Sequence, residues 1–385
     1  MPRPTVSDIG KAAGVSLATV DRVLNGRPGV RQSTIDKVNA AIVEIGYVRD
    51  VAAANLARSR QYRFAFVLPV GGGSFLASIK AAVEATAGTP VAERTEARVV
   101  EVPGGDPHAL VRILRSMDGS ELDGIAILAD ETPQLRDEVT RLRARGVCVV
   151  AILSDLPNTE RDHFVGIDAV AAGRTAGVLM GRFLGGRRGA IVTLANSMLS
   201  REALERRLGF DEVVVGRFPS LAVLPTIEVH DDPDRVRDAL TAVLARREDV
   251  VGVYALGSGH RGLVEALAAW CDSPARRDAP ADAPSAVEAR TPVDASMPVD
   301  APMPVVAPMP VVVAHDLTHH LAGGLRGGLV DAVITQDVDH VVRSAIRVLR
   351  AKSDRQAIIE SQERIRIEIV LAENLPGSGE TAGAG

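Results

Sequence analysis

"GVSLATVDRVLNG", at residues 14–26, decides how the first part of the chain folds. Gly14 suits the left-handed turn that follows a helix, and the Ser16 hydroxyl can accept from a backbone N–H at the start of the next helix. Apolar residues then recur at the spacing of one helical face, at Val20, Val23 and Leu24. The stretch therefore predicts a tight turn followed by a short amphipathic helix.

Two further helices are predicted around it. Thr5-Val6-Ser7-Asp8 and Ser33-Thr34-Ile35-Asp36 both have the capping-box form [ST]-x-x-[DE], which marks a helix start. The first helix should end near Ala13, so that only residues 14–16 separate it from the second. This is the spacing of a helix-turn-helix. The outward face of the second helix, which is available to DNA, carries Leu17, Ala18, Asp21, Arg22 and Asn25.

Charge is distributed unevenly along the chain. The whole chain of 385 residues has a formal net charge of −5. Residues 1–60 hold nine Lys or Arg against five Asp or Glu, which leaves +4 there and −9 on the remainder. A basic N-terminal segment on an acidic body indicates that this segment alone meets a polyanion.

"TVSDIGKAAGVSLATVDRVLNGRPGVRQSTIDKVNAAIVEIGYVRDVAAANLARSR" resembles the DNA-binding headpiece of the lac repressor / galactose repressor (LacI/GalR) family of bacterial transcription regulators. The resemblance implies that Leu17, Ala18 and Arg22 contact bases. It implies phosphate contacts from Thr5, Ser16, Thr19, Asn25 and Thr34, although Thr5 and Ser16 would also serve as helix caps without DNA. The family usually has Ser in place of Asp21. We hypothesise that Asp21 accepts from cytosine N4 or orients an arginine, and we group it with the base contacts.

The same resemblance divides the N-terminal part into a headpiece at 1–48 and a hinge helix at 49–61. An Ala-rich helix of this length is marginal alone, so we expect it to fold only when two copies meet on DNA. Leu56 stands where family members wedge a leucine into the minor groove. The alternative for Leu56 is packing against its counterpart in the partner copy.

From Arg63 onward, apolar strand-like runs alternate with helical ones, which predicts parallel sheets with helices on both faces. The series occurs twice, so the fold class is multi-domain: an all-α headpiece followed by a two-lobed α/β domain at 62–373. The latter resembles the type I periplasmic sugar-binding fold. A Pro/Ala-rich insertion at about 271–310 and a tail at 374–385 are expected to be disordered.

Effector contacts are inferred only from this resemblance. It places an Arg, an Asp and a Gln of the ligand cleft at Arg201, Asp316 and Gln336, whose groups can bind sugar hydroxyls. Phe75 is a candidate to stack on a sugar face, and Glu131 is a further candidate. Core packing or a surface salt bridge is the alternative for each. The family often offers Asn or Asp near 255–260, where this chain has "ALGSGH". One interpretation is that His260 substitutes for that ligand contact; the one we favour is that His260 is a solvated loop residue.

These observations predict a cytoplasmic, homodimeric repressor that binds double-stranded operator DNA and a small carbohydrate or polyol effector. No signal peptide or membrane span is expected, and neither is a metal, cofactor or enzymatic activity. Two alternatives remain. One is a carbohydrate-binding protein of the transport type. The other is an NAD-dependent enzyme, which rests on Gly257-x-Gly259-x-x-Gly262, a dinucleotide pattern that is weak alone.

Overall fold

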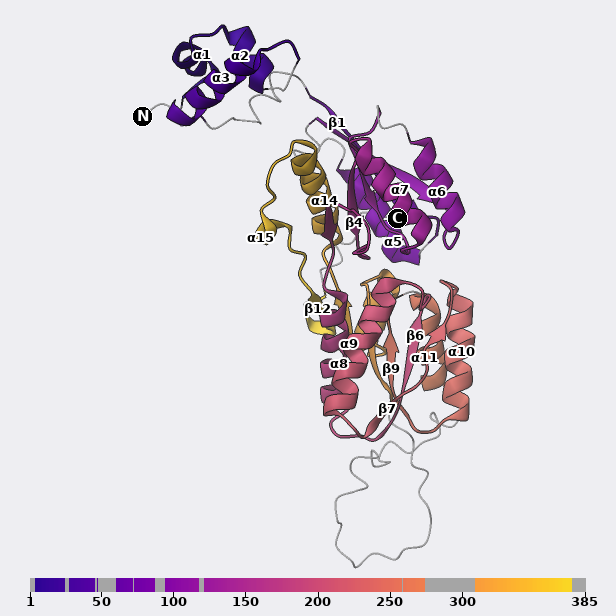
Figure 1. Cartoon of the computed structure of the whole chain (residues 1–385). Helices are drawn as coiled ribbons and strands as arrows, with labels where there is room; N and C mark the ends of the chain where they lie inside the picture. Colours follow the sequence, from indigo (N-terminus) through magenta and orange to yellow (C-terminus); the bar gives the residue numbers. More distant parts are fainter. Residues whose placement is uncertain are drawn as a thin grey trace, which may run out of the picture. The chain divides into compact units, whose positions relative to one another are not determined.

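The structure of the protein is a computed structural model. It describes residues 4–24, 28–45, 47, 60–71, 73–86, 94–117, 121–257, 259–273 and 309–375. The chain divides into two compact units, one over Met1–Arg60 and one over Gln61–Gly385 (Figure 1). The predicted contacts at Asn25 and Leu56 lie outside the described residues, as do most of the predicted hinge helix, insertion and tail.

The first unit has the predicted helix-turn-helix. Its helices are α1 (Val6–Ala13), α2 (Leu17–Leu24) and α3 (Gln32–Ile45). Gly14 ends α1 in the left-handed conformation, with φ of 65°, and its N–H bonds back to the carbonyls of the last turn. The helices meet around a small core in which Ile9, Val20 and Val38 are fully buried. The predicted turn is confirmed, and so is the predicted apolar face of α2, because Val20, Val23 and Leu24 all pack in this core.

The structure confirms two of the three helix starts that the sequence predicts in this unit. Ser16 Oγ accepts from the N–H of Thr19 at 3.2 Å, as predicted. At α1 the Asp8 carboxylate accepts from the N–H and the hydroxyl of Thr5. The prediction that α3 begins with a cap at Ser33 is wrong, because the N–H groups of Thr34 and Ile35 bond to the Arg31 carbonyl and α3 begins at Gln32, two residues earlier than a cap at Ser33 implies.

The first α/β lobe is built on a five-stranded sheet with the order β2-β1-β3-β4-β5, and every pair in it is parallel. Its strands are β1 (Tyr62–Pro69), β2 (Thr95–Val102), β3 (Gly124–Ile127), β4 (Cys148–Ile152) and β5 (His163–Val165). Helices α6 (Pro107–Ser116) and α7 (Pro133–Ala144) cover one face. The other face is covered by α5 (Gly73–Ala85) and by α14 (Val338–Ser353), which returns from far along the chain.

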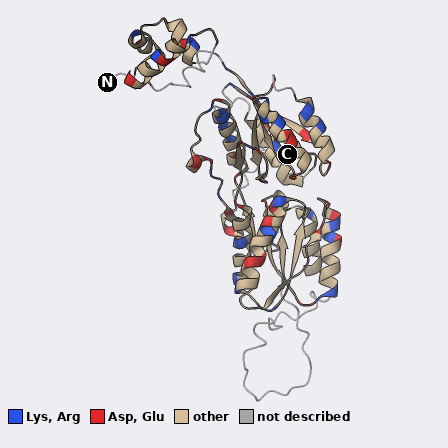
Figure 2. Ribbon diagram, viewed as in Figure 1, with Lys and Arg blue, Asp and Glu red and all other residues tan. Residues whose placement is uncertain are grey.

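The second lobe contains a seven-stranded sheet, β12-β11-β10-β9-β6-β7, with β8 paired to β6. Its strands are β6 (Gly189–Ala195), β7 (Leu221–Val223), β8 (Ile227–Glu228), β9 (Val250–Ala255), β10 (Val311–His315), β11 (Ala332–Thr335) and β12 (Glu368–Val370). The strands β6, β9, β10 and β11 contain no charged residue, in contrast to the helices around them (Figure 2). Only β12 runs antiparallel among its pairs. The expected parallel α/β architecture is confirmed.

Helices of the second lobe also lie on both faces of its sheet. One face packs against α10 (Pro233–Arg246), α11 (His260–Cys271) and α13 (His319–Arg326). The other packs against α8 (Ala169–Phe183) and α9 (Arg201–Arg217). The chain passes between the two sheets at β5 to α8, at β11 to α14, and again through α15 (Glu360–Glu363) to β12. Within the described residues no helix is both long and apolar enough to cross a bilayer.

Helices α8 and α9 approach each other closely through glycines (Figure 1). A Cβ on Gly209 would lie 2.1 Å from the Val170 carbonyl oxygen, and one on Gly173 would lie 2.0 Å from the Arg206 carbonyl oxygen. Both clashes are with backbone, which cannot turn aside as a flexible side chain can. Glycine at these positions therefore sets the place of α9 on the sheet.

We predict that Gly209→Ala lowers the free energy of unfolding by about 1–3 kcal/mol, because the methyl group forces α8 and α9 apart. The matched control is Gly216→Ala on the same helix, where an added Cβ meets nothing within 4 Å. That change should be neutral or should stabilise by up to about 1 kcal/mol. Urea unfolding of both variants measures the difference, and equal stability would contradict the close approach.

Candidate functional site

The exposed face of α2 carries the side chains that the sequence assigned to base contacts. Leu17 is 56% exposed, an unusual position for a leucine, and Ala18 and Arg22 beside it are also exposed. Asp21 lies on the same face and is half-buried. The opposite face of α2 holds the buried Val20. The helix therefore presents a mixed apolar and basic surface outward.

The described residues assigned to phosphate contacts lie near helix starts. Thr5 precedes α1, Ser16 precedes α2 with its hydroxyl 2.9 Å from that of Thr19, and Thr34 lies in the first turn of α3. Helix N-termini carry unpaired N–H groups and a partial positive charge, so they bind anions readily. This geometry agrees with phosphate contacts, although the caps at Thr5 and Ser16 also have a structural role.

The second unit contains a pocket of about 620 Å³ lined by residues of both lobes. Its walls are formed by segments that directly follow strands. Examples are Asp130 after β3, Ser154 after β4, Asn196 after β6 and Gln336 after β11. Because the strands of each lobe are nearly all parallel, their carboxyl ends meet at one edge of the sheet, which is where open α/β sheets bind ligands.

Four of the five candidate effector contacts line this pocket: Phe75, Glu131, Asp316 and Gln336. Arg201 does not. Its guanidinium pairs with Glu205 at 2.7 Å, and the arginine of α9 that lines the pocket is Arg206. Five residues along a helix turn the side chain by about 140°, so the two arginines of α9 point in different directions. Arg201, the residue named from the sequence, therefore lies outside the described pocket wall, and Arg206 of the same helix lies on it.

Arg206 forms a buried ion pair with Asp316. Its side chain is 5% exposed, and its Nη1 lies 3.2 Å from Asp316 Oδ2 and 2.5 Å from the Leu256 carbonyl oxygen. Asp316 follows β10 with a left-handed φ of 65°, a conformation that costs a non-glycine residue about 1 kcal/mol or more. An added Cβ on Gly257 would lie 3.0 Å from each partner, so glycine there leaves room for the pair.

Three ring side chains that contact one another, those of His315, Tyr254 and Phe210, are near this pair in the fold. His315 directly precedes Asp316, and Phe210 is one helical turn after Arg206. The His315 Nε2 atom lies 2.8 Å from the Tyr254 hydroxyl, and Tyr254 stacks on Phe210 with ring centroids 4.2 Å apart. Burial lowers the pKa of His315 well below its ordinary range and raises that of Tyr254. Both groups are therefore neutral at neutral pH, so neither adds a charge beside Arg206 and Asp316.

His260 corrects another expectation, because it is buried on the pocket wall rather than solvated in a loop. Its Nδ1 lies 3.3 Å from the Thr318 hydroxyl, while its Nε2 has no hydrogen-bond partner. Burial lowers the pKa of His260 to about 4, so the ring is neutral at neutral pH. It stands at the first residue of α11, at the position where the sequence departs from the family.

The glycines of the dinucleotide-like pattern have packing roles. Gly259 precedes α11 with φ of 66°, and a Cβ on Gly262 would lie 1.8 Å from the Pro233 carbonyl oxygen. Gly257 makes room for the Arg206–Asp316 pair, as described above. The packing of this lobe accounts for all three glycines without a bound dinucleotide.

Glu131, Gln336 and Phe75 differ in how they are held. Glu131 Oε1 accepts from Arg136 at 2.9 Å and its Oε2 accepts from the Asn158 N–H, so its charge is already balanced. Gln336 is 4% exposed, and its Oε1 accepts no hydrogen bond. Phe75 is partly buried and packs against the core of the first lobe. Of the three, Gln336 offers the least satisfied polar atom to a ligand.

Comparison with known proteins identifies both units. Residues 64–274 match the family described as "Periplasmic binding protein domain". Residues 5–50 match "Bacterial regulatory proteins, lacI family". The chain belongs to the periplasmic binding protein domain family and carries a lacI-family domain. The regulatory match covers all three helices of the headpiece, and the binding-protein match includes Arg206.

Several curated relatives of this chain carry the names of bacterial regulatory proteins. Catabolite control protein A of Priestia megaterium is 27% identical over 43% of this chain and 47% of its own length. The HTH-type transcriptional regulator CelR of Thermobifida fusca is 28% identical over 55% of this chain and 62% of its own. The maltose regulon regulatory protein MalI of Vibrio furnissii is 46% identical over 52 residues. The chain thus spans about half the length of the curated relatives it matches.

Solved structures of transport proteins share the fold of the binding-protein unit. A solute binding protein of Burkholderia graminis, determined in complex with D-arabinose, superposes with a TM-score of 0.65 over 83% of this chain and 98% of its own, at 17% identity. GanP, a glucose-galactose binding protein of Geobacillus stearothermophilus, gives 0.64 over 82% and 99%, at 14% identity. These identities show the fold alone.

Burial of His260 predicts a pH dependence of stability. The unfolded chain binds a proton at the ordinary pKa of 6.5, whereas the folded chain binds it only near 4, so folding becomes less favourable as pH falls between these values. We predict that His260→Gln removes about 2–4 kcal/mol of the stability that the protein loses between pH 7 and pH 4. Urea unfolding at both pH values measures this. His108→Gln, at an exposed position, is the control, and equal losses in both variants would contradict the prediction.

Proposed function

We propose that this chain is a transcriptional repressor that binds operator DNA through α2 and releases or retains it according to a sugar-like effector in the pocket. One observation carries the proposal. A lacI-family headpiece and a two-lobed ligand pocket with a buried Arg206–Asp316 pair occur on the same chain. The alternative is a binding protein of the transport type, which the solved structures with this fold favour. That alternative does not account for the exposed surface of α2.

Binding to DNA would place α2 in the major groove. The guanidinium of Arg22 can donate two parallel hydrogen bonds to guanine O6 and N7, and Leu17 and Ala18 can contact thymine methyl groups. Hydroxyls and N–H groups at the helix starts would hold the phosphates and set the register. Base contacts would therefore come from α2, and much of the affinity from the phosphates.

Effector binding would use the groups that face the pocket. Arg206 donates from a fixed fork, Asp316 accepts, and the Gln336 carbonyl has no donor of its own. Adjacent hydroxyls of a sugar or polyol both donate and accept, so they complement this set. The volume of about 620 Å³ is within the range of small-molecule sites, roughly 300–1,000 Å³.

We also propose a homodimer that acts in the cytosol, where its DNA lies. A symmetric dimer binds two half-sites of a pseudo-palindromic operator, because the protein's two-fold axis is mirrored in the DNA. The pocket is lined by both lobes, and the chain passes between their sheets three times. A ligand held by both lobes would favour one arrangement of them, which is the coupling that allosteric control requires.

The first prediction from this function concerns DNA recognition. An operator is first isolated by selection from random duplexes. We expect Arg22→Ala to weaken operator binding by about 1–3 kcal/mol and to relax the preference at one base pair of each half-site. Arg22→Lys, the control, keeps the charge and the salt dependence but loses the discrimination. Asp21→Ser should bind all sequences more tightly and lose a preference for cytosine.

Fluorescence anisotropy measures these affinities as a function of salt. If Asp21→Ser keeps the operator preference of the parent, Asp21 is a charge penalty only. If log K does not fall steeply with log[salt] and no footprint appears, the proposed function itself is wrong.

The second prediction concerns the effector. A thermal-shift screen against sugars and polyols should find ligands that raise the melting temperature, because they bind only the folded state. We expect Arg206→Ala to weaken each of them about tenfold or more, whereas Arg201→Ala leaves their affinities unchanged. Arg206→Lys preserves the buried charge in case the alanine variant unfolds. Equal effects at Arg201 and Arg206 would overturn the assignment of the cleft.

A further inference from the structure

We propose that the pocket selects an uncharged or amine-bearing sugar or polyol and rejects sugar phosphates and sugar acids. This inference rests on the proposed function and concerns the chemical class of its effector. It follows from the charges on the pocket wall, from how each is already paired, and from two buried polar atoms that have no partner.

Carboxylates outnumber guanidinium groups on the described wall of the pocket. The guanidinium groups belong to Arg206 and Arg261. The carboxylates belong to Asp106, Asp130, Glu131, Glu202, Asp231 and Asp316. A concave wall of one predominant sign concentrates its field in the cavity. An anionic ligand would therefore meet net repulsion.

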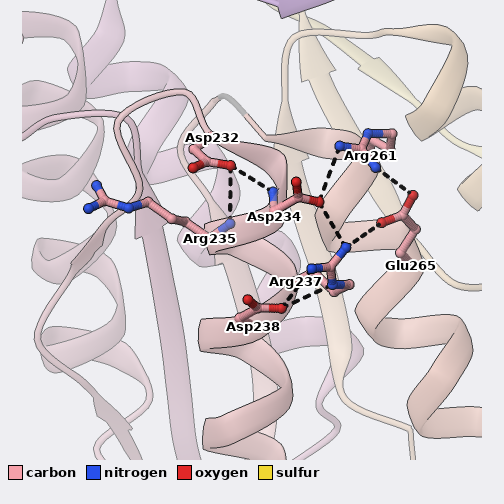
Figure 3. Close-up of polar contacts among 7 residues, drawn as sticks. All are labelled: Asp232, Asp234, Arg235, Arg237, Asp238, Arg261 and Glu265. Atoms are coloured by element: carbon pink, nitrogen blue, oxygen red, sulfur yellow. Dashed lines mark hydrogen bonds and ion pairs between the residues drawn. The ribbon is translucent and has the colours of Figure 1, made fainter.

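Both guanidinium groups are already engaged by the protein. Arg206 pairs with Asp316 inside the wall. Arg261 lies between Glu265, 3.0 Å away, and Asp234, 3.4 Å away, and Arg237 joins the same cluster (Figure 3). A phosphate would have to take one of these guanidinium groups from its carboxylate, which would leave that carboxylate without a counter-charge.

Burial disfavours the charged forms of two carboxylates on the pocket wall, those of Glu202 and Asp130. Burial raises the pKa of Glu202, with Asp316 and Asp130 adding to the effect and Arg206 opposing it. Burial also raises the pKa of Asp130. Such shifts show that ionisation of these groups is disfavoured where they stand. A protonated amine on the ligand would relieve that cost, whereas a second anion would increase it.

Histidines do not supply the missing positive charge. Burial lowers the pKa of His260 to about 4, and the pKa of His320 is also lowered, by burial and by the neighbouring His319. Helix N-termini contribute about half a charge each. Those of α5, α6, α7, α9, α10 and α11 reach the wall, and the carboxylates of Asp106, Glu202 and Asp232 oppose those of α6, α9 and α10. These partial charges do not offset the excess of carboxylates.

Two unpartnered atoms give an independent indication. Gln336 and His260 line the pocket and are more than nine-tenths buried, and neither Gln336 Oε1 nor His260 Nε2 has a hydrogen-bond partner. The Gln336 oxygen can only accept, so it needs a donor from the ligand. A hydroxyl or an ammonium group can donate this bond. The ionised phosphate or carboxylate of an anionic sugar cannot, so only the remaining hydroxyls of such a ligand could satisfy the atom.

The test uses isothermal titration calorimetry on the full chain with matched sugar sets. Each set contains a neutral sugar, its amino sugar, its phosphate and its uronic acid, for example glucose, glucosamine, glucose 6-phosphate and glucuronate. For every scaffold that binds, we expect the anionic members to be about tenfold weaker or more than the neutral parent. An anionic member that binds as tightly as its parent would overturn the inference.

Substitutions on the pocket wall test whether Asp130 and Glu202 produce the selectivity. Asp130→Asn with Glu202→Gln should narrow the gap between neutral and anionic ligands, and Asp130→Asn alone serves if the double variant fails to fold. Glu205→Gln is the matched control, since Glu205 is on the same helix but pairs with Arg201 outside the described wall. An unchanged gap in the Asp130 and Glu202 variants would contradict the assignment. If no sugar of any set binds, the effector part of the proposed function fails, and this inference fails with it.

Discussion

The buried ion pair between Arg206 and Asp316 is the interaction on which the site depends. Desolvating two charges costs several kcal/mol per ion, and their mutual attraction often does no more than offset that cost. The same place holds a left-handed Asp316, an unpartnered His260 nitrogen and an unpartnered Gln336 oxygen. Folds seldom keep strain, buried charge and unsatisfied polar atoms together unless a ligand uses them. These destabilising features occur together at one edge of the sheets, which indicates that a ligand binds there.

The fold was largely predictable because its signals are local. Gly14 and Ser16 define the turn between α1 and α2 through their own backbone and side-chain preferences, and the apolar strands read as buried parallel strands without any knowledge of the rest of the chain. The start of α3 was misplaced because Ser33 and Asp36 match the capping-box pattern. In the structure the Arg31 carbonyl instead accepts the first hydrogen bonds of the helix. Capping patterns mark a helix start to within a residue or two.

The site was only partly predictable because its contacts are not local. Asp316 and Gln336 were named from the family resemblance alone, and both line the pocket. Arg206 was missed because the choice between arginines on α9 depends on which face packs against α8, and that is set by contacts such as Gly209 on Val170. Burial of His260 likewise arises from Thr318, which is distant in sequence. For the choice between the two arginines, the sequence offered one signal, which is their spacing on α9. Positions 201 and 206 lie about 140° apart around a helix, so their side chains point in different directions.

The route of the chain connects the pocket to both lobes. Gln336 lies at the crossing from β11 to α14, and α14 packs on the first sheet through residues such as Val342 and Ile346. Arg206 lies on α9, whose place is set by backbone contact with α8, which itself follows the crossing from β5. A ligand that binds Gln336 and Arg206 together therefore acts on two of the three crossings. Because packed helices shift as units rather than deforming continuously, the proposed allosteric control requires that such a ligand favour one arrangement of the two lobes.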